Sequence, residues 1–198
     1  MKLVLASKNP GKLKELQEIL GSLGVEVLLE SQVGLDPEVE ETGTTFAENA
    51  FLKADAVMRA SGLPAIADDS GLVVDALDGA PGVYSARFGG KESDGERTAL
   101  LLEKLEGVPV EKRTARFVSA IACCLPDGRT ITADGSCEGV IADAPRGQGG
   151  FGYDPVFLVP PLGRTFAELS AEEKNRISHR GSALRAFAEK FRQEVEPC

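Results

Sequence analysis

The chain has 198 residues, enough for one α/β domain or two closely joined lobes. Its hydrophobic content of 42% and charged content of 27% are typical of a soluble globular protein. The net charge of −9 argues against a surface that coats a nucleic-acid backbone, because such surfaces need clustered lysine and arginine. A small anionic substrate is still possible, because a local group of lysines can act against the sign of the whole chain.

The cysteines and the apolar runs indicate where the protein works. None of the four cysteines belongs to a C-x-x-C pair or has a histidine nearby, so we expect no zinc site. Cys123 and Cys124 stand in an apolar run and are interpreted as small core residues of a protein in a reducing compartment. Leu3–Ala6 is too short for a signal-peptide core, and no apolar run approaches the roughly 18 residues of a membrane span. We therefore expect a cytoplasmic protein.

The first expected unit is a strand, a short loop and a helix. Leu3–Ala6 is an apolar run bounded by polar residues, which is typical of a buried strand. Asn9 is a suitable N-cap, and Pro10 suits the first position of a helix. One helical stripe of apolar side chains follows: Leu13, Leu16, Ile19, Leu20 and Leu23.

The start of this helix is a candidate phosphate site. A helix N-terminus offers free N–H groups and partial positive charge, and here Lys8 and Lys12 stand beside it. The segment lacks the G-x-x-x-x-G-K-[ST] pattern of a Walker loop. An ordinary capped helix with solvated lysines is the alternative.

A second helix is expected after the strand Val25–Leu29. A capping box of the form T-x-x-E begins at Thr45 and opens a helix that reaches about Ser61. Asn49 and Lys53 stand four residues apart and therefore share one face of this helix.

The acidic segment Glu38–Glu41 precedes that helix and has two interpretations. Runs of acidic residues are usually solvated loops. Alternatively, the segment supplies a metal-binding carboxylate that faces Asp69.

The stretch Ala65–Leu77 joins two apolar runs through two adjacent carboxylates, Asp68 and Asp69. We expect the Ser70–Gly71 pair to turn the backbone between two buried strands. Buried carboxylates are stable only when they are paired, hydrogen-bonded or bound to a metal. The pair therefore indicates a magnesium site for a phosphate reaction. A polar turn with one solvated and one capping aspartate is the alternative.

The middle of the chain predicts a helix and a hairpin. After the structured, glycine-rich loop Gly79–Gly90, the pattern favours a helix over Glu92–Leu105. Thr114–Leu125 is strand-like, Pro126–Arg129 is a strong turn signal, and Arg129–Cys137 alternates as the second arm of a hairpin.

Gly147–Pro155 contains four glycines around Phe151 and Tyr153. Glycine lets the backbone approach a ligand closely. An exposed aromatic ring at such a site stacks on a planar base, with a gain of roughly 1–3 kcal/mol in nucleic-acid systems. The alternative is a loop whose aromatic residues plug the core.

The C-terminal part predicts a short strand at Val156–Val159 and two helices. Ser170 caps the first helix, which carries Lys174 and ends at Ser178–Gly181. The one histidine, His179, stands at the start of the last helix and is either a reader of a purine edge or a surface capping residue. The apolar stripe of the last helix is Leu184, Phe187, Ala188, Phe191 and Val195.

Five separated parts of the chain match one protein family in the same order. They are Ser7–Lys12; Glu41–Phe46 with Glu48–Ala50 and Lys53–Ala54; Ala67–Gly71; Phe151–Asp154; and Ser178–Gly181. The chain resembles the inosine/xanthosine triphosphate pyrophosphatases, which are also called Ham1-like or RdgB-like non-canonical purine nucleoside triphosphate pyrophosphatases. The resemblance implies an α/β fold in a single domain, residues 1–198. In that fold, a long twisted mixed β-sheet carries helices that form two lobes around a central cleft.

The resemblance also implies an activity and a set of site residues. Family members are typically homodimers that need Mg²⁺ and cleave ITP, dITP and XTP to the monophosphate and pyrophosphate, which removes deaminated purines. Asp69 is the implied general base and metal neighbour, and Glu41 or Glu40 is the implied second metal carboxylate. Position 8 is Lys where family members often have Gly, and we expect its side chain to point outward. The implied substrate-binding residues are Ser7, Lys8, Asn9, Pro10, Gly11, Lys12, Lys53, Ser70, Phe151, Gly152, Tyr153, Asp154, Lys174, His179 and Arg180.

Three other functions are alternatives. An aspartate-nucleophile phosphatase uses a D-x-D pair, whereas the two aspartates here are adjacent. A nucleotide sensor without catalysis would bind purine triphosphates and leave them intact. A Maf-like pyrophosphatase would act on pyrimidine or methylated nucleotides. We expect no nucleic-acid polymer and no membrane as partner.

Overall fold

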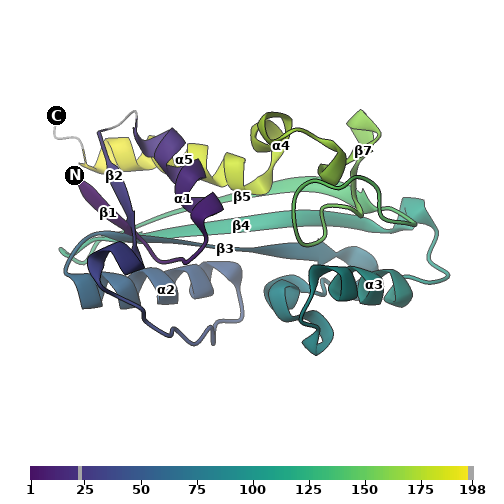
Figure 1. The fold of residues 1–198 in the computed structure, drawn as a ribbon, viewed down its shortest axis with the longest axis horizontal. Helices are drawn as coiled ribbons and strands as arrows, with labels where there is room; N and C mark the ends of the chain where they lie inside the picture. The colour runs from purple at the N-terminus through teal and green to yellow at the C-terminus, as the bar shows by residue number, and fades with distance from the viewer. Residues whose placement is uncertain (22–23, 196–198) are drawn as a thin grey trace. The chain divides into compact units, whose positions relative to one another are not determined.

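The computed structural model describes residues 1–21 and 24–195 of the chain. These residues form a seven-stranded sheet in the order β2-β1-β3-β4-β5-β6-β7 (Figure 1). The sheet is mixed, because β1 is parallel to β2 and β3, whereas β6 is antiparallel to β5 and β7. The strands are β1 (Lys2–Leu5), β2 (Glu26–Leu29), β3 (Ala65–Val74), β4 (Thr114–Cys124), β5 (Thr130–Ile141), β6 (Phe157–Val159) and β7 (Arg164–Thr165).

Five α-helices of the described residues accompany the sheet, which confirms the α/β fold class. Leu23, the last residue of the stripe predicted for the first helix, lies outside the described residues. None of the described helices combines the length and the apolar character that a membrane span requires. The helices are α1 (Pro10–Leu20), α2 (Phe46–Ser61), α3 (Asp94–Lys104), α4 (Ala171–Ile177) and α5 (His179–Val195).

Local sequence signals set the starts of α1 and α2 as predicted. The Asn9 side chain accepts hydrogen bonds from the N–H groups of Gly11 (2.8 Å) and Lys12 (3.4 Å), which satisfies donors that the helix itself leaves unpaired. Thr45 and Glu48 form a reciprocal capping box that begins α2. Both helices therefore start at fixed residues, which places Lys12 in the first turn of α1 and Lys53 about two turns into α2.

The predicted turn at Ser70–Gly71 is wrong, because β3 runs without interruption from Ala65 to Val74. Successive side chains of a strand point to opposite faces of the sheet, so the two aspartates are separated without a turn. Each aspartate also has a lysine partner, which removes the need to solvate either carboxylate in a loop.

The chain forms two compact units. Unit 1 consists of Met1–Asp69, Ser119–Gly135 and Ser182–Cys198, and unit 2 consists of Ser70–Val118 and Ser136–Gly181. The boundary falls inside β3, so Asp69 belongs to unit 1 and the next residue to unit 2. The expectation of one domain with two lobes stays a prediction beside this division.

Unit 1 buries apolar side chains on both faces of its strands. On one face, Leu3 of β1 packs in a cluster with Leu16 of α1 and Phe187 of α5. On the other face, Val4 belongs to a cluster with Ala54 of α2. Within unit 1, α1 and α5 thus cover one face and α2 covers the other (Figure 1). Polar residues of α1 and α2 consequently reach the strands from opposite sides.

The adjacent cysteines are core residues, as predicted. Cys123 and Cys124 are buried, one in each apolar cluster of unit 1. Burial raises the pKa of both thiols, so the reactive thiolate form is disfavoured.

Unit 2 has an aromatic core of its own. The Phe117 ring lies 4.6 Å from the Phe157 ring and 5.7 Å from the Phe166 ring, measured between centroids. Leu101 of α3 is buried in the same cluster. This core supports the loop that precedes β6 and the start of α5.

Candidate functional site

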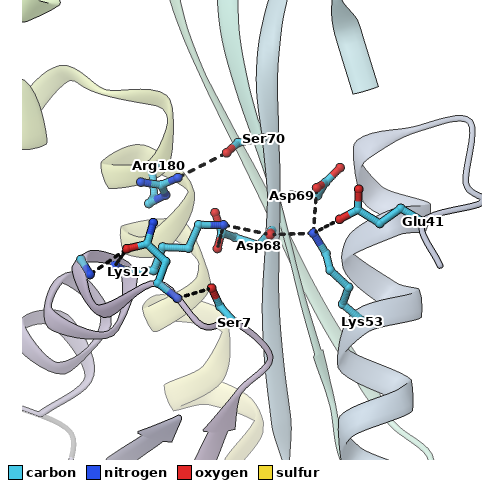
Figure 2. A network of polar contacts seen from close by, with 10 residues as sticks. Ser7, Lys12, Glu41, Lys53, Asp68, Asp69, Ser70 and Arg180 are labelled. Carbon is cyan, nitrogen blue, oxygen red and sulfur yellow. Dashed lines mark hydrogen bonds and ion pairs between the residues drawn. The ribbon is translucent and has the colours of Figure 1, made fainter. Parts of the chain in front are cut away.

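Two aspartates of β3 and two lysines from different helices lie together in unit 1 (Figure 2). The Lys12 ammonium, in the first turn of α1, lies 2.8 Å from Asp68 Oδ1. The Lys53 ammonium, on α2, lies 2.8 Å from Asp69 Oδ1. Because side chains alternate along a strand, each carboxylate meets a different helix. The adjacent carboxylates therefore have separate counterions.

The Lys53 ammonium also binds Glu41, in the segment before α2, at 2.9 Å (Figure 2). It contacts the backbone carbonyl oxygen of Asp68 at 3.2 Å as well. An ammonium group has three N–H donors, and these three acceptors match that number. Glu40 is exposed, so Glu41 is the acidic residue that this geometry brings to Asp69. The combination of Lys12, Glu41, Lys53, Asp68 and Asp69 is called the charged group below.

Burial disfavours the ionised form of Asp69 and raises the pKa of its carboxyl group; Lys53 offsets this only in part, and Glu41 adds to it. For Lys53, burial disfavours the charged ammonium, but the Asp69 and Glu41 carboxylates outweigh burial and raise its pKa. Lys53 therefore remains a cation. A carboxylate with a raised pKa accepts a proton more readily, which suits Asp69 to the role of a general base.

The donor set of unit 1 fits a magnesium ion. Mg²⁺ takes oxygen ligands and is usually held by one or two carboxylates together with waters and substrate phosphates. Asp69 and Glu41 provide two carboxylates that already converge on one cation, the Lys53 ammonium. In residues 1–21 and 24–195 no group of three or more His, Cys, Asp or Glu side chains is arranged to hold a metal ion. Water and phosphate oxygens would therefore have to complete the coordination.

The loop Ser7–Lys12 leads into the N-terminus of α1 and ends at a partly buried lysine. Ser7 Oγ accepts a hydrogen bond from the Asn9 N–H at 3.1 Å, and Asn9 in turn caps α1. The helix N-terminus adds partial positive charge near Lys12, the combination that binds phosphate groups in many proteins.

Lys8 points outward, as expected. Its side chain is 65% exposed and forms an ion pair with Asp36. Exposed ion pairs of this kind contribute little to stability. Of the two lysines in the loop, Lys12 is the one that belongs to the charged group.

In unit 2, Asp154 organises the loop that contains the Phe151–Asp154 motif. Asp154 is buried, and its Oδ2 accepts a hydrogen bond from the Phe151 N–H at 2.9 Å. The same oxygen forms an ion pair with Lys174 of α4. A Cβ atom at Gly150 would lie 2.0 Å from this oxygen, and Gly150 has a φ of +74°, so only glycine fits there.

The two aromatic residues of this loop have different environments. Phe151 is 57% exposed, and its ring faces the Lys174 ammonium at 4.7 Å and the Arg180 guanidinium at 5.8 Å. Tyr153 is buried instead, and its hydroxyl donates a hydrogen bond to the Ser85 carbonyl at 2.8 Å. Burial raises the pKa of Tyr153 to about 12. Phe151 is therefore accessible to a ligand. Tyr153 instead belongs to the core, so the prediction of an exposed aromatic ring holds for Phe151 and is wrong for Tyr153.

The start of α5 places His179 and Arg180 inside unit 2. The His179 ring stacks on Phe117 with centroids 4.8 Å apart, and the residue is 7% exposed. The alternative of a surface capping histidine is therefore wrong. Arg180 donates a hydrogen bond from Nη2 to Ser70 Oγ at 3.3 Å (Figure 2). Ser70, Arg180 and Phe151 are thus linked through the Arg180 side chain.

Two further residues hold these groups in place, and neither was among the predicted site residues. Asn49 is buried in α2; its sequence signals are the helical spacing to Lys53 and its place in the matched segment Glu48–Ala50. Asp94, at the start of α3, accepts a hydrogen bond from the Gly152 N–H at 2.7 Å. Nothing near Asp94 in the sequence indicates a partner 58 positions away.

Comparison with known proteins finds similarity along nearly the whole chain. A family model described as the Ham1 family matches residues 3–190. The dITP/XTP pyrophosphatase of a Thermus thermophilus strain is 54% identical over 100% of this chain and 95% of its own length. The protein of the same name from Geobacillus kaustophilus is 52% identical over 98% of this chain and 95% of its own length.

Solved structures show the same similarity. A HAM1 protein from Coxiella burnetii has a TM-score of 0.92 and 45% identity, covering 98% of this chain and 99% of its own. The Ham1 protein of Staphylococcus aureus has a TM-score of 0.91 and 43% identity, covering 98% of this chain and 100% of its own. The fold and the sequence therefore point to the same group of proteins.

Proposed function

Because the chain belongs to the Ham1 family, we propose that it is a magnesium-dependent pyrophosphohydrolase of non-canonical purine nucleoside triphosphates. Its proposed substrates are ITP, dITP and XTP, its products are the monophosphate and pyrophosphate, and its task is to remove deaminated purines from the nucleotide pool. The relatives named dITP/XTP pyrophosphatase support this proposal. The observation that carries it is the convergence of Asp69 and Glu41 on the partly buried ammonium of Lys53.

The triphosphate is assigned to the cations of unit 1. A chain of net charge −9 needs local positive charge to bind an anionic substrate. Lys12 and Lys53 have side chains only 19% and 16% exposed, and each is held by a carboxylate of β3. Their orientation is therefore set before a substrate arrives, which reduces the entropy lost on binding.

Asp69 and Glu41 are the residues that would hold Mg²⁺. The ion, when bound, supplies positive charge to the phosphate oxygens and favours ionisation of a bound water. Lys53 contacts both carboxylates, so it is suited to keep Glu41 and Asp69 together.

Asp69 is assigned as the general base. Its raised pKa suits it to accept a proton from the attacking water while the bond between the α- and β-phosphates breaks. Hydrolysis then releases pyrophosphate in one step without a covalent enzyme intermediate. The alternation of Asp68 and Asp69 supports this choice, because an aspartate-nucleophile phosphatase needs two carboxylates on the same side.

The nucleoside is assigned to unit 2. The exposed Phe151 ring offers a stacking surface, and Asp154 fixes the loop that carries it. The 6-oxo group of hypoxanthine or xanthine accepts a hydrogen bond, whereas the 6-amino group of adenine donates one. Arg180 supplies only donors, so facing an amino group would leave both sides unpaired at a cost of roughly 1–3 kcal/mol. His179 and Ser70 complete this proposed base-reading set.

A panel of nucleoside triphosphates with Mg²⁺, scored for pyrophosphate release, tests the proposed function. We expect fast release from dITP, ITP and XTP and slow release from ATP. Binding without hydrolysis would indicate a sensor, and a trapped aspartyl-phosphate with release of orthophosphate would indicate a phosphatase. Preference for pyrimidine or methylated nucleotides would indicate a Maf-like enzyme. Each of these three outcomes would contradict the proposal.

The homodimer and the cytoplasmic location stay predictions. Sedimentation velocity of the purified chain checks the first, and cell fractionation checks the second.

A further inference from the structure

Asn49 of α2 has an amide group that is only half used by the protein. The residue is 0% exposed, and its Oδ1 accepts a hydrogen bond from the Gly43 N–H at 2.8 Å. A backbone N–H needs an oxygen acceptor, so this contact fixes which way the amide is oriented. Nδ2 is then buried, and none of the described residues accepts a hydrogen bond from it. Such a donor is costly in a folded protein, which calls for a functional explanation.

The contact with Gly43 fixes the segment that carries Glu41. A Cβ atom at Gly43 would lie 2.6 Å from Asn49 Oδ1 and 2.7 Å from Glu48 Cβ, so this segment lies tightly against α2. Glu48 holds the same segment by accepting a hydrogen bond from the Thr44 N–H at 2.7 Å. Glu41 is two residues before Gly43, so the position of its carboxylate depends on this attachment.

Asn49 also lies one helical turn before Lys53, whose ammonium binds Asp69 and Glu41. Oδ1 of Asn49 therefore fixes the segment that carries Glu41, while the amide lies on the face of α2 that carries Lys53, the residue whose ammonium joins Glu41 and Asp69.

We propose that Asn49 is a positioning residue for hydrolysis, which fixes the Glu41 segment through Oδ1 and supports the Asp69 carboxylate through Nδ2. The inference rests on the proposed function. When Lys53 contacts a substrate phosphate, Asp69 loses part of its hydrogen bonding, and the proposed replacement is the Nδ2 donor of Asn49, one helical turn before Lys53. Asn49 itself touches neither water nor nucleotide in this account.

The test compares Asn49→Ala and Asn49→Asp with Ser119→Ala. Ser119 is a matched control, because its Oγ is also buried in unit 1, has no hydrogen-bond partner among the residues that the structure describes, and is not part of the charged group. Asn49→Asp keeps an acceptor for the Gly43 N–H and removes the donor, so it carries the test if Asn49→Ala does not fold. Thermal unfolding shows which variants are folded.

We expect kcat for dITP to fall at least about tenfold in both Asn49 variants, because small errors in the position of catalytic groups have large effects on rate. KM should stay within about threefold, and Ser119→Ala should match the wild-type protein. In an Asp69→Asn background, which prevents turnover, Asn49→Ala should leave the equilibrium affinity for dITP unchanged. A purely structural role would instead lower stability and leave kcat per folded molecule intact.

The outcomes separate this inference from the proposed function. If the wild-type protein releases no pyrophosphate from dITP, the proposed function is wrong and the role of Asn49 falls with it. If the wild-type protein is active and a folded Asn49 variant keeps its kcat within about twofold, only the role of Asn49 is overturned.

Discussion

The two units arrange their polar side chains in different ways. In unit 1, lysines and carboxylates bind each other directly, as in the contact of Lys53 with Asp69 and Glu41. In unit 2, Lys174 also binds a carboxylate, that of Asp154, but the cations of Lys174 and Arg180 lie in addition near the exposed ring of Phe151. Opposite charges in close contact suit a reaction that moves a proton and neutralises phosphate. A cation-flanked aromatic surface suits a planar base and its edge.

This difference predicts a division of effects. Substitutions in the charged group of unit 1 should mainly change the rate of hydrolysis, whereas substitutions in unit 2 should mainly change affinity and the choice of base. The predictions below run from the largest expected effect to the smallest.

Asp69→Asn should reduce kcat by more than about a hundredfold, because an amide cannot accept the proton of the attacking water. The affinity for dITP should survive, because Lys12 and Lys53 remain. Pyrophosphate release and equilibrium binding measure the two quantities. Asp68→Asn is the matched control: it makes the same change one residue away, at a carboxylate that holds Lys12, and should cost much less. An equal loss of kcat in the two variants would contradict the assignment of Asp69 as the general base.

Asp154→Ala should raise KM for dITP by about tenfold and keep kcat within about threefold, because the Phe151 N–H and Lys174 lose their shared acceptor. Steady-state kinetics measures the split. Asp75→Ala serves as control, since Asp75 is an exposed carboxylate of unit 2 paired with Arg116. A fall in kcat with unchanged KM would mean that Asp154 affects the rate of hydrolysis, which would contradict the proposed division of effects between unit 1 and unit 2.

Arg180→Ala should narrow the preference for ITP over ATP by about fivefold to tenfold, because a donor facing the 6-oxo group is lost. The ratio of kcat/KM for the two nucleotides is the measurement. The hydrogen bond to Ser70 is also lost, so thermal unfolding must show that the variant is folded. An unchanged ratio in a folded variant would mean that another group reads the base.

The smallest expected effect concerns stability and pH. Burial raises the pKa of Asp69, so its ionisation opposes folding as the pH rises through the folded-state pKa. At pH 7, Asp69→Asn should therefore unfold a few degrees above the wild-type protein, as is common when a strained active site is relaxed. The difference should shrink as the pH falls and Asp69 is protonated. A variant less stable than the wild type at pH 7 would show that the ion pair with Lys53 outweighs burial.

The sequence alone predicted the secondary structure correctly where local signals determine it. The capping box at Thr45 and the apolar stripe of α5 predicted helices that are present. It did not predict the structure where a contact with a residue far away in the sequence determines the conformation or the burial of a side chain. In the continuous strand β3, Asp68 is paired with Lys12, 56 positions earlier, and no local pattern around the two aspartates reveals this partner. The burial of Tyr153 depends on a carbonyl at Ser85, 68 positions away.

The same difference between local and distant signals applies to the residues of the candidate site. Motif spacing singled out Lys53, Asp69 and Arg180, but it left the choice between Glu40 and Glu41 open. The structure brings Glu41 to Lys53, because the segment before α2 is attached to the helix through Gly43 and Asn49. That attachment joins residues whose sequence alone carries no sign of the contact.

The most direct test is equilibrium binding of dITP and dATP to two inactive proteins, Asp69→Asn and Asp69→Asn with Arg180→Ala. The proposed division between the two units predicts that the first protein binds dITP with near wild-type affinity and still prefers it over dATP, whereas in the second protein this preference is about fivefold to tenfold smaller. Loss of the preference in the first protein, or an unchanged preference in the second, would contradict the proposed division.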